Sequence, residues 1–142
     1  MANNFDLSQF LPYALNQAAE ATSVGFQKYY REKYGMVRTE WRVLFHLGQY
    51  GAMTAKDLCA RASLHKTKVS RAVHALEQKR FLSRTTQEHD RRHETLTLTR
   101  QGKEVYADLY EAAKRYDAEL SSQFSPQERE ILNRCLERIA RI

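Results

Sequence analysis

Hydrophobic periodicity changes once along this chain, after Phe81, and this change restricts the fold more than any other feature. Residues 95–99 read Thr-Leu-Thr-Leu-Thr, so polar and apolar side chains alternate as they do on a half-buried strand. Residues 82–86 are a suitable antiparallel partner, and the segment between them, 87–94, carries no apolar side chain. We therefore expect a β-hairpin with a long solvated tip, set in a chain whose other segments have helical periodicity.

Two helices are expected ahead of this hairpin, in the first third of the chain. Apolar residues recur at three- and four-residue steps from Leu11 onwards, with Pro12 suited to a first turn and Gly35 to a C-terminal break. A second helix is expected over residues 39–50, with Thr39 as its N-cap.

The next segment predicts two short helices joined by a tight turn. Thr54 is the expected N-cap of the first, and Asp57 lies close to its positive N-terminal end. Ser63 is the expected N-cap of the second, which covers about residues 64–79. A pair of this kind is a helix-turn-helix motif.

Two further helices are expected after the hairpin. Thr99 would cap a long helix over residues 100–121, and the sequence Ser-Pro-Gln-Glu at 125–128 has the pattern that begins a helix. The apolar face of this last helix continues to Ile142. Because a chain terminus normally frays unless something holds it, we expect this face to pack against a second copy of the chain.

These elements predict one domain over residues 1–142, mostly α-helical with a small β-hairpin, a size that suffices for a single core. Residues 39–99 would form a winged helix-turn-helix lobe that binds DNA. Residues 5–34 and 100–142 would form a helical dimerisation region. No apolar stretch is long enough to span a bilayer and the first residues do not resemble a secretory signal, so we expect a cytoplasmic protein with no membrane partner.

Positive charge is concentrated in the middle third of the chain. Between Lys56 and Lys103 there are 12 Lys and Arg against 5 Asp and Glu, whereas the other residues carry 11 against 12. The whole excess of positive charge, a net +6 for the chain, therefore belongs to the segment with the helix-turn-helix and the hairpin. A basic module between two neutral flanks is typical of a protein that binds nucleic acid.

The helix expected over residues 64–79 has one apolar face, with Val69, Val73 and Leu76, and one face of hydrogen-bonding side chains. Such side chains suit base edges and phosphates in a major groove. An ordinary solvated helix face has a similar composition, but the place of this helix as the second of the motif favours recognition. The predicted DNA contacts here are Lys66, Thr67, Lys68, Ser70, Arg71 and His74.

The hairpin tip supplies a second set of candidates. An arginine at the end of a two-stranded ribbon can enter a narrow minor groove, and an aspartate two residues away can hold its guanidinium by a bidentate contact. The predicted DNA contacts at the tip are Arg91, Arg92 and His93, with Asp90 as the orienting residue. A charged loop that only keeps the hairpin soluble is the alternative, and spacing alone does not decide between them.

The pattern Asp90-x-Arg92, Leu98-Thr99 and Gly102 resembles the wing signature of the MarR family of bacterial transcriptional regulators. The order of helices and hairpin fits that family, and the resemblance covers essentially the whole chain. It continues upstream in Thr39-x-Trp41-Arg42-Val43-Leu44, Leu58, Thr67-x-Val69-Ser70-Arg71 and Leu76-Glu77.

One position departs from the pattern of this family. Its members usually carry glycine just after the recognition helix, where this chain has Lys79-Arg80-Phe81. A non-glycine residue in a left-handed conformation costs about 1 kcal/mol, so we expect the end of this helix to be built differently.

The resemblance implies a homodimer whose first, fifth and sixth helices interlock. It also implies a sequence-specific repressor that a small ligand, often an aromatic or phenolic acid, releases from a near-palindromic operator. By analogy the ligand would bind between the lobe and the dimer helices, with Tyr30, Trp41 and His46 as candidate lining residues. Packing in the core or the interface is the alternative role of these three side chains.

Two other functions stay open. A metal- or redox-sensing regulator on the same scaffold has little support, because no helical i, i+4 ligand pair occurs and both Cys59 and Cys135 lie among aliphatic residues, where thiols are usually buried. A helical adaptor without DNA binding would explain the apolar last helix but not the charge. There is no glycine-rich phosphate loop and no nucleophile motif, so we expect no enzyme, no cofactor and no metal site.

Overall fold

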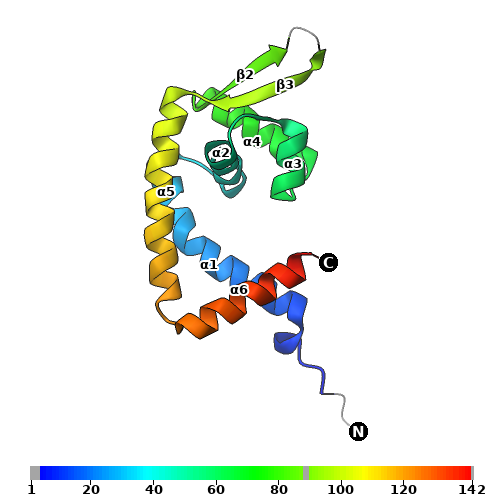
Figure 1. The fold of residues 1–142 in the computed structure, drawn as a ribbon, viewed down its shortest axis with the longest axis vertical. Coiled ribbons are helices and arrows are strands. Elements are labelled where there is room, and N and C mark those ends of the chain that lie inside the picture. The colour runs from blue at the N-terminus through cyan, green and yellow to red at the C-terminus, as the bar shows by residue number, and fades with distance from the viewer. Residues whose placement is uncertain (1–3, 88–89, 142) are drawn as a thin grey trace. The chain divides into compact units, whose positions relative to one another are not determined.

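A computed structural model describes residues 4–87 and 90–141, and within the hairpin the side chains of residue 87 and of residues 90–93 lie outside the description. The chain divides into two compact units, residues 1–107 and 108–142, and the long helix α5 passes from one into the other. The elements in chain order are a 3₁₀ turn Leu7–Gln9, α1 Leu11–Tyr34, α2 Arg38–Tyr50, β1 Met53–Thr54, α3 Ala55–Ala62, α4 Lys66–Gln78, β2 Leu82–Gln87, β3 Asp90–Leu98, α5 Arg100–Ser121 and α6 Pro126–Ala140 (Figure 1).

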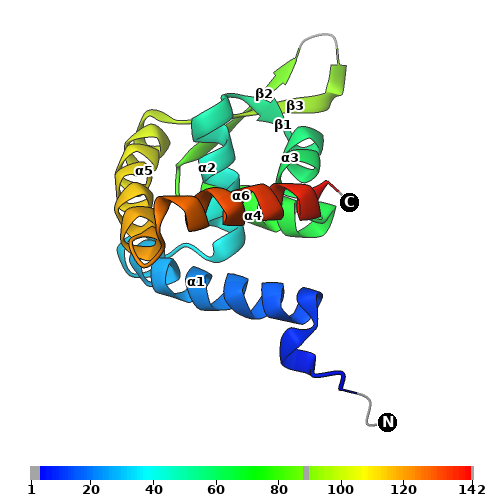
Figure 2. The ribbon, with the colours of Figure 1, turned by 60° about the horizontal axis from the view of Figure 1, so that its bottom comes forward.

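The first unit has the predicted winged helix-turn-helix at its centre. Helices α2, α3 and α4 bury their apolar sides together, and the three-stranded antiparallel sheet has the order β1-β3-β2. Figure 2 shows the short β1 beside β3 at the base of the hairpin. The buried side chains that these elements share are Val43, Leu44, Leu47, Leu58, Val69, Ala72, Val73, Leu76, Leu96 and Leu98.

Strand β1 is an element that the sequence did not predict. Met53 pairs with Leu96 and Thr54 with Thr95, so β1 has only two residues. A strand this short shows no alternation of polar and apolar residues, and it exists because β3 offers it a free edge. The third strand therefore depends on a long-range contact that no local pattern reveals.

The hairpin is confirmed, but its tip is shorter than expected. Pairing runs from Leu82 with Leu98 to Thr86 with Glu94, then shifts register, and Gln87 pairs with Asp90. The prediction that residues 87–94 form a long connection is therefore wrong. Strand pairing uses backbone N–H and C=O groups, so it continues through charged residues that show no hydrophobic alternation.

Two predicted caps are wrong by a few residues. Helix α2 begins at Arg38, not at Thr39, and the carboxylate of Glu40 accepts the backbone N–H of Val37 at 3.3 Å. Ser63 ends α3 in a left-handed conformation with φ of 52° and does not cap the next helix.

Helix α4 is capped by a histidine. The Nδ1 atom of His65 accepts the backbone N–H of Thr67 at 3.2 Å, so α4 begins two residues later than predicted. An imidazole nitrogen can take the place of a hydroxyl or carboxylate oxygen as acceptor, but histidine is not a usual N-cap residue. The other predicted caps, Thr54, Thr99 and Ser125, are confirmed.

The end of α4 also differs from the expectation, because a left-handed residue is present without a glycine. Arg80 has φ of 65°. The N–H of Phe81 donates to Leu76 O and that of Arg80 to Glu77 O, both at 2.9 Å. This pair of bonds is a Schellman motif, in which the residue after the cap adopts the left-handed conformation. The chain therefore keeps the turn that glycine normally makes and accepts the strain of an arginine there.

Arg80→Gly should consequently stabilise the protein by about 1 kcal/mol, because glycine has no Cβ to strain the left-handed conformation. Urea denaturation at fixed protein concentration measures the difference. Gln78→Gly is the matched control, since it places glycine two residues earlier at an exposed helical position, and it should cost about 1 kcal/mol. Equal destabilisation by both substitutions would contradict the strained turn.

The second unit holds the rest of α5 and α6. Ser125 and Glu128 form the predicted capping box at the start of α6, with both bonds present at 3.2 and 3.0 Å. No described residue of α6 is buried, and the apolar side chains Ile131, Leu132 and Leu136 are 57%, 44% and 42% exposed. No helix in the described part of the chain is long and apolar enough to cross a membrane.

Candidate nucleic-acid interface

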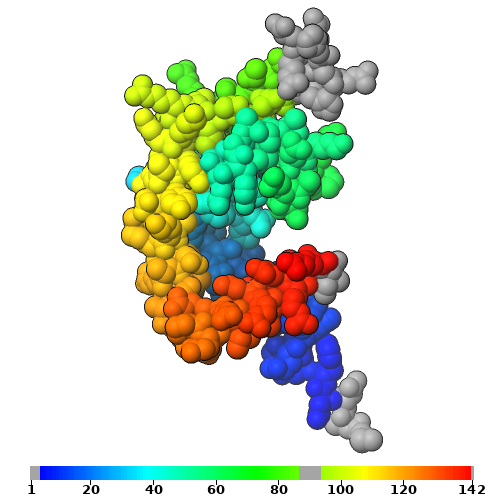
Figure 3. Space-filling model, in the orientation of Figure 1, coloured from blue at the N-terminus to red at the C-terminus, as the bar shows by residue number. Residues whose placement is uncertain are grey.

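The helix-turn-helix presents one face of α4 to solvent. Val69, Ala72 and Val73 turn inward and are at most 3% exposed. The six side chains predicted to contact DNA from this helix are all exposed: Lys66, Thr67, Lys68, Ser70, Arg71 and His74. In the space-filling view α3 and α4 lie against each other on one side of the first unit (Figure 3). A rigid helix with an apolar back and a polar front is the geometry that major-groove recognition needs.

The tip of the hairpin carries the other predicted contacts. Residues 90–93 lie in β3, at the far end of the strand from α5. The side chains of Asp90, Arg91, Arg92 and His93 lie outside the described part of the chain. Their contacts with DNA, and the hold of Asp90 on Arg92, therefore stay predictions.

A cavity of about 660 Å³ lies between α3, α4 and the sheet. Its apolar wall includes Val73 and Leu96, while Lys56, Lys66 and Ser70 bring an ammonium or hydroxyl group to it. Two of these three, Lys66 and Ser70, were predicted DNA contacts; Lys56 was not. The position of Lys56 in the first turn of α3 could have predicted a phosphate contact, because the first helix of such a motif crosses the DNA backbone.

Arg84 of β2 lies on the same cavity and holds two carboxylates. Its Nε donates to Glu77 of α4 at 3.1 Å, and its Nη1 donates to Glu94 of β3 at 3.2 Å. Partial burial lowers the pKa of Arg84, but the two carboxylates outweigh burial and the net shift is upward. The guanidinium therefore stays charged. No local sequence pattern indicates this cluster, because its members lie on three different elements.

The Leu-Thr and glycine positions of the wing signature form a joint between α4 and α5. Thr99 donates its backbone N–H to Phe81 O at 3.0 Å and its hydroxyl to Arg80 O at 2.6 Å. The same hydroxyl accepts the N–H of Gly102 at 3.0 Å. A Cβ on Gly102 would lie 2.0 Å from Phe81 O, so only glycine permits this approach.

An aromatic cluster lies between α1 and α2. Tyr30 stacks on Trp41 with ring centroids 5.9 Å apart, and Phe26 meets Trp41 edge-on at 5.4 Å. Burial raises the pKa of Tyr30, although nearby Arg38 opposes the shift. The indole Nε1 of Trp41 is buried, and it has no hydrogen-bond partner among the described residues. Tyr30 and Trp41, two of the three candidate ligand contacts, are thus brought together.

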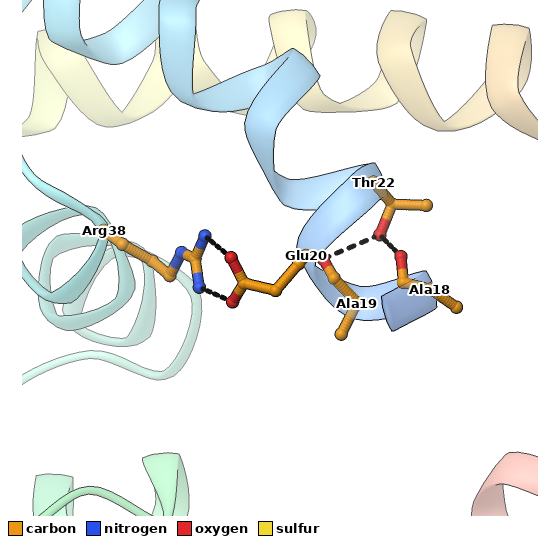
Figure 4. Close-up of polar contacts among 5 residues, drawn as sticks. All are labelled: Ala18, Ala19, Glu20, Thr22 and Arg38. Atoms are coloured by element: carbon orange, nitrogen blue, oxygen red, sulfur yellow. Dashed lines mark hydrogen bonds and ion pairs between the residues drawn. The ribbon is translucent and has the colours of Figure 1, made fainter. Parts of the chain in front are cut away.

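The third candidate, His46, lies apart from this cluster. Its Nδ1 is 2.7 Å from the carbonyl of Arg42, and its ring lies beside that of Tyr50 at 5.8 Å. Close to the cluster, Arg38 of α2 binds both carboxylate oxygens of Glu20 of α1, at 2.8 and 3.4 Å (Figure 4). This bidentate pair ties α1 to α2 beside Tyr30.

Comparison with known proteins agrees with this geometry. Residues 34–93 match the sequence model of the MarR family. The HTH-type transcriptional regulator YwoH of Bacillus subtilis is 25% identical over 99 residues, 70% of this chain and 72% of that protein. The MarR/EmrR family transcriptional regulator of Acinetobacter sp. ADP1 superposes with a TM-score of 0.87 at 23% identity, over 96% of each chain. The winged helix-turn-helix of this chain is thus similar in sequence and in fold to that of MarR-family regulators.

BpsR of Bordetella bronchiseptica shares the fold of this chain, with a TM-score of 0.87 at 19% identity over 97% of this chain and 98% of BpsR. The structure of BpsR is described as showing how 6-hydroxynicotinic acid regulates its DNA binding. The matches support a transcriptional regulator of the MarR family as the coarse function of this chain.

The cysteines and the potential metal ligands of this chain bear on the metal- or redox-sensing alternative. Among the described residues, no group of three or more His, Cys, Asp and Glu side chains is placed to hold a metal ion. Cys59 is half-buried and lies on the cavity beside Lys56. Cys135 is exposed on α6, so the expectation that both thiols are buried is wrong for the single chain. An amphipathic helix explains the difference, because an apolar face is buried only where something covers it.

Proposed function

We propose that this chain is a sequence-specific DNA-binding repressor that acts as a homodimer. One observation carries the proposal: the exposed polar face of α4, which holds the six predicted contacts, is fixed to the core by a buried apolar face. Lys56 and Lys66 flank the same surface with positive charge. Such a surface attracts the DNA backbone and offers hydrogen-bonding groups to base edges.

A second copy of the chain is the proposed partner of the helical region. Ile131, Leu132 and Leu136 of α6, together with Leu7 and Leu11 near the N-terminus, are 42–57% exposed in the single chain. Apolar side chains that face solvent along α6, and those that face solvent beside the start of α1, each mark a surface for association. A two-fold dimer would carry two α4 helices and two hairpins, and would favour a near-palindromic operator.

The proposed effector is a small aromatic or phenolic acid. Its support is the buried indole N–H of Trp41, which has no acceptor among the described residues, beside the ring of Tyr30. An unpaired buried donor costs free energy that a ligand oxygen could recover. The regulation of BpsR by an aromatic acid agrees with this chemistry. The metal- or redox-sensing alternative has only the cysteines in its favour.

The experiment is a fluorescence-anisotropy titration of a duplex from the upstream region of the protein's own gene, at several salt concentrations. We expect tight binding whose logarithm falls linearly with the logarithm of the salt concentration. Arg92→Ala should weaken binding and reduce that slope by about 2, because each protomer loses one phosphate or groove contact. Arg115→Ala removes the same charge from an exposed position on α5 and should leave the slope unchanged.

Two results would contradict the proposal. If the wild-type protein binds neither this duplex nor unrelated DNA at low salt, DNA binding is not its function. If Arg92→Ala binds as tightly as the wild type at moderate salt, the assignment of the hairpin tip is wrong.

A further inference from the structure

Arg84 joins the two parts of the proposed DNA interface. It lies in β2, and its two hydrogen bonds reach Glu77 in the last turn of α4 and Glu94 in β3. The cluster of Arg84, Glu77 and Glu94 therefore spans the recognition helix and both strands of the hairpin. The turn at residues 79–81 and the buried side chains that α4 shares with the sheet also join these elements.

The charges of this cluster are unusual for a surface that binds DNA. Two carboxylates surround one guanidinium, so the cluster as a whole is negative. Arg84 and Glu94 line the same cavity as Lys56 and Lys66. A DNA phosphate would be repelled by Glu77 and Glu94 if they served only as surface charges. Two of the N–H groups of Arg84, at Nε and Nη1, are already given to carboxylates.

The cluster also contributes little to folding. The side chains of Arg84, Glu77 and Glu94 are 35%, 38% and 42% exposed, and ion pairs with this exposure add little to stability. Their clearest structural consequence is the link between α4 and the two strands. When two DNA-binding elements are linked rigidly, DNA binding by one places the other at a high effective concentration near its own contact on the DNA. This gain is lost when the link allows the wrong geometry.

We propose that Arg84 is a positioning residue, which binds Glu77 and Glu94 together and so holds α4 and the hairpin in the arrangement that lets both engage DNA at once. This inference rests on the proposed DNA-binding function and adds a residue that the DNA does not need to touch. Glu77 and Glu94 support DNA binding through Arg84 despite their negative charge.

The sign of the effect separates positioning from simple electrostatics. Glu94→Thr keeps a residue that favours a strand but cannot reach Arg84, and Glu77→Ala keeps a good helix former. Each raises the net charge by one, so electrostatics alone predicts tighter binding to DNA. The positioning role predicts weaker binding, by about threefold for each variant, because exposed ion pairs of this kind hold the arrangement only modestly. The melting temperature should stay within a few degrees of the wild-type value.

The test is the anisotropy titration with the upstream duplex, on wild type, E94T, E77A, R84Q and the double variant R84Q/E94T. The double variant should bind no more weakly than R84Q, because the two residues act as one unit. Glu104→Ala is the control, since it removes an exposed acid whose described pairing is with Arg100 of the same helix, and it should not weaken binding.

If the wild type binds and both E94T and E77A bind as tightly or more tightly, the inference is overturned while the proposed function stands. Additive losses in the double variant would also overturn it. If the wild type binds no DNA, the proposed function fails and the inference falls with it. Because the two acids lie on different elements, misfolding of one variant leaves the other to decide.

Discussion

Gly102→Ala should lower the free energy of unfolding by about 3 kcal/mol, as expected where a methyl group is forced into a filled space. The new Cβ would lie 2.0 Å from the carbonyl oxygen of Phe81, and the contact is with backbone, which cannot rotate away as a side chain can. Relief would require α5 to move away from the end of α4. That movement would break the bonds of Thr99 to Phe81 and Arg80.

Urea denaturation of the two proteins at equal concentration measures this loss, since the stability of a dimer depends on concentration. Gln101→Ala is the control, because it is the preceding exposed helical residue and should change stability by less than about 0.5 kcal/mol. If Gly102→Ala is as stable as that control, the close packing of α5 on the end of α4 is wrong.

Arg71→Ala should cause the largest loss of sequence preference. Arg71 lies on the exposed face of α4, and a bidentate arginine contact to guanine is worth about 2 kcal/mol of discrimination. In a homodimer the loss occurs at both half-sites. The ratio of affinities for the upstream duplex and for unrelated DNA measures it. That ratio should fall in Arg71→Ala.

Lys68→Ala is the matched control for Arg71. It removes one positive charge from the exposed surface of the same helix. A lysine that contacts phosphate should weaken binding to both DNAs alike and leave the ratio unchanged. If Arg71→Ala behaves in the same way, Arg71 only contacts phosphate and sequence is read elsewhere.

The sequence predicted well those elements whose signals are local. The Ser-Pro-Gln-Glu start of α6 and the Thr54–Asp57 cap of α3 each span only four residues, and both are present. The hairpin was likewise visible, because the alternation at residues 95–99 is a property of one strand. Local chemistry decides these features, so a local pattern is sufficient to find them.

The features that were missed depend on residues far apart in the chain. Strand β1 exists only beside β3, and the cluster at Arg84 unites three elements. The turn at Arg80 was missed for another reason. The absence of glycine suggested a different helix end, whereas the packing of Phe81 and the bonds of Thr99 hold an arginine in the strained conformation.

In the candidate site, too, the parts set by local sequence were predicted and the contacts between helices were not. The face of α4 follows from helical periodicity, so its six polar residues could be named from the sequence and are exposed together. Tyr30 and Trp41 meet across two helices, which the sequence could suggest only by resemblance. His46 does not join them, because it lies five residues beyond Trp41 on α2 and faces Tyr50.

Methylation protection of the upstream duplex tests the central claim most directly, because it reports which guanine N7 atoms are covered in the major groove. Two α4 helices related by a two-fold axis predict two protected clusters about 10 base pairs apart, with protection lost in Arg71→Ala. Binding without any protected guanine in a duplex whose half-sites contain guanine, or protection that persists in Arg71→Ala, would contradict the assignment of α4 as the recognition helix.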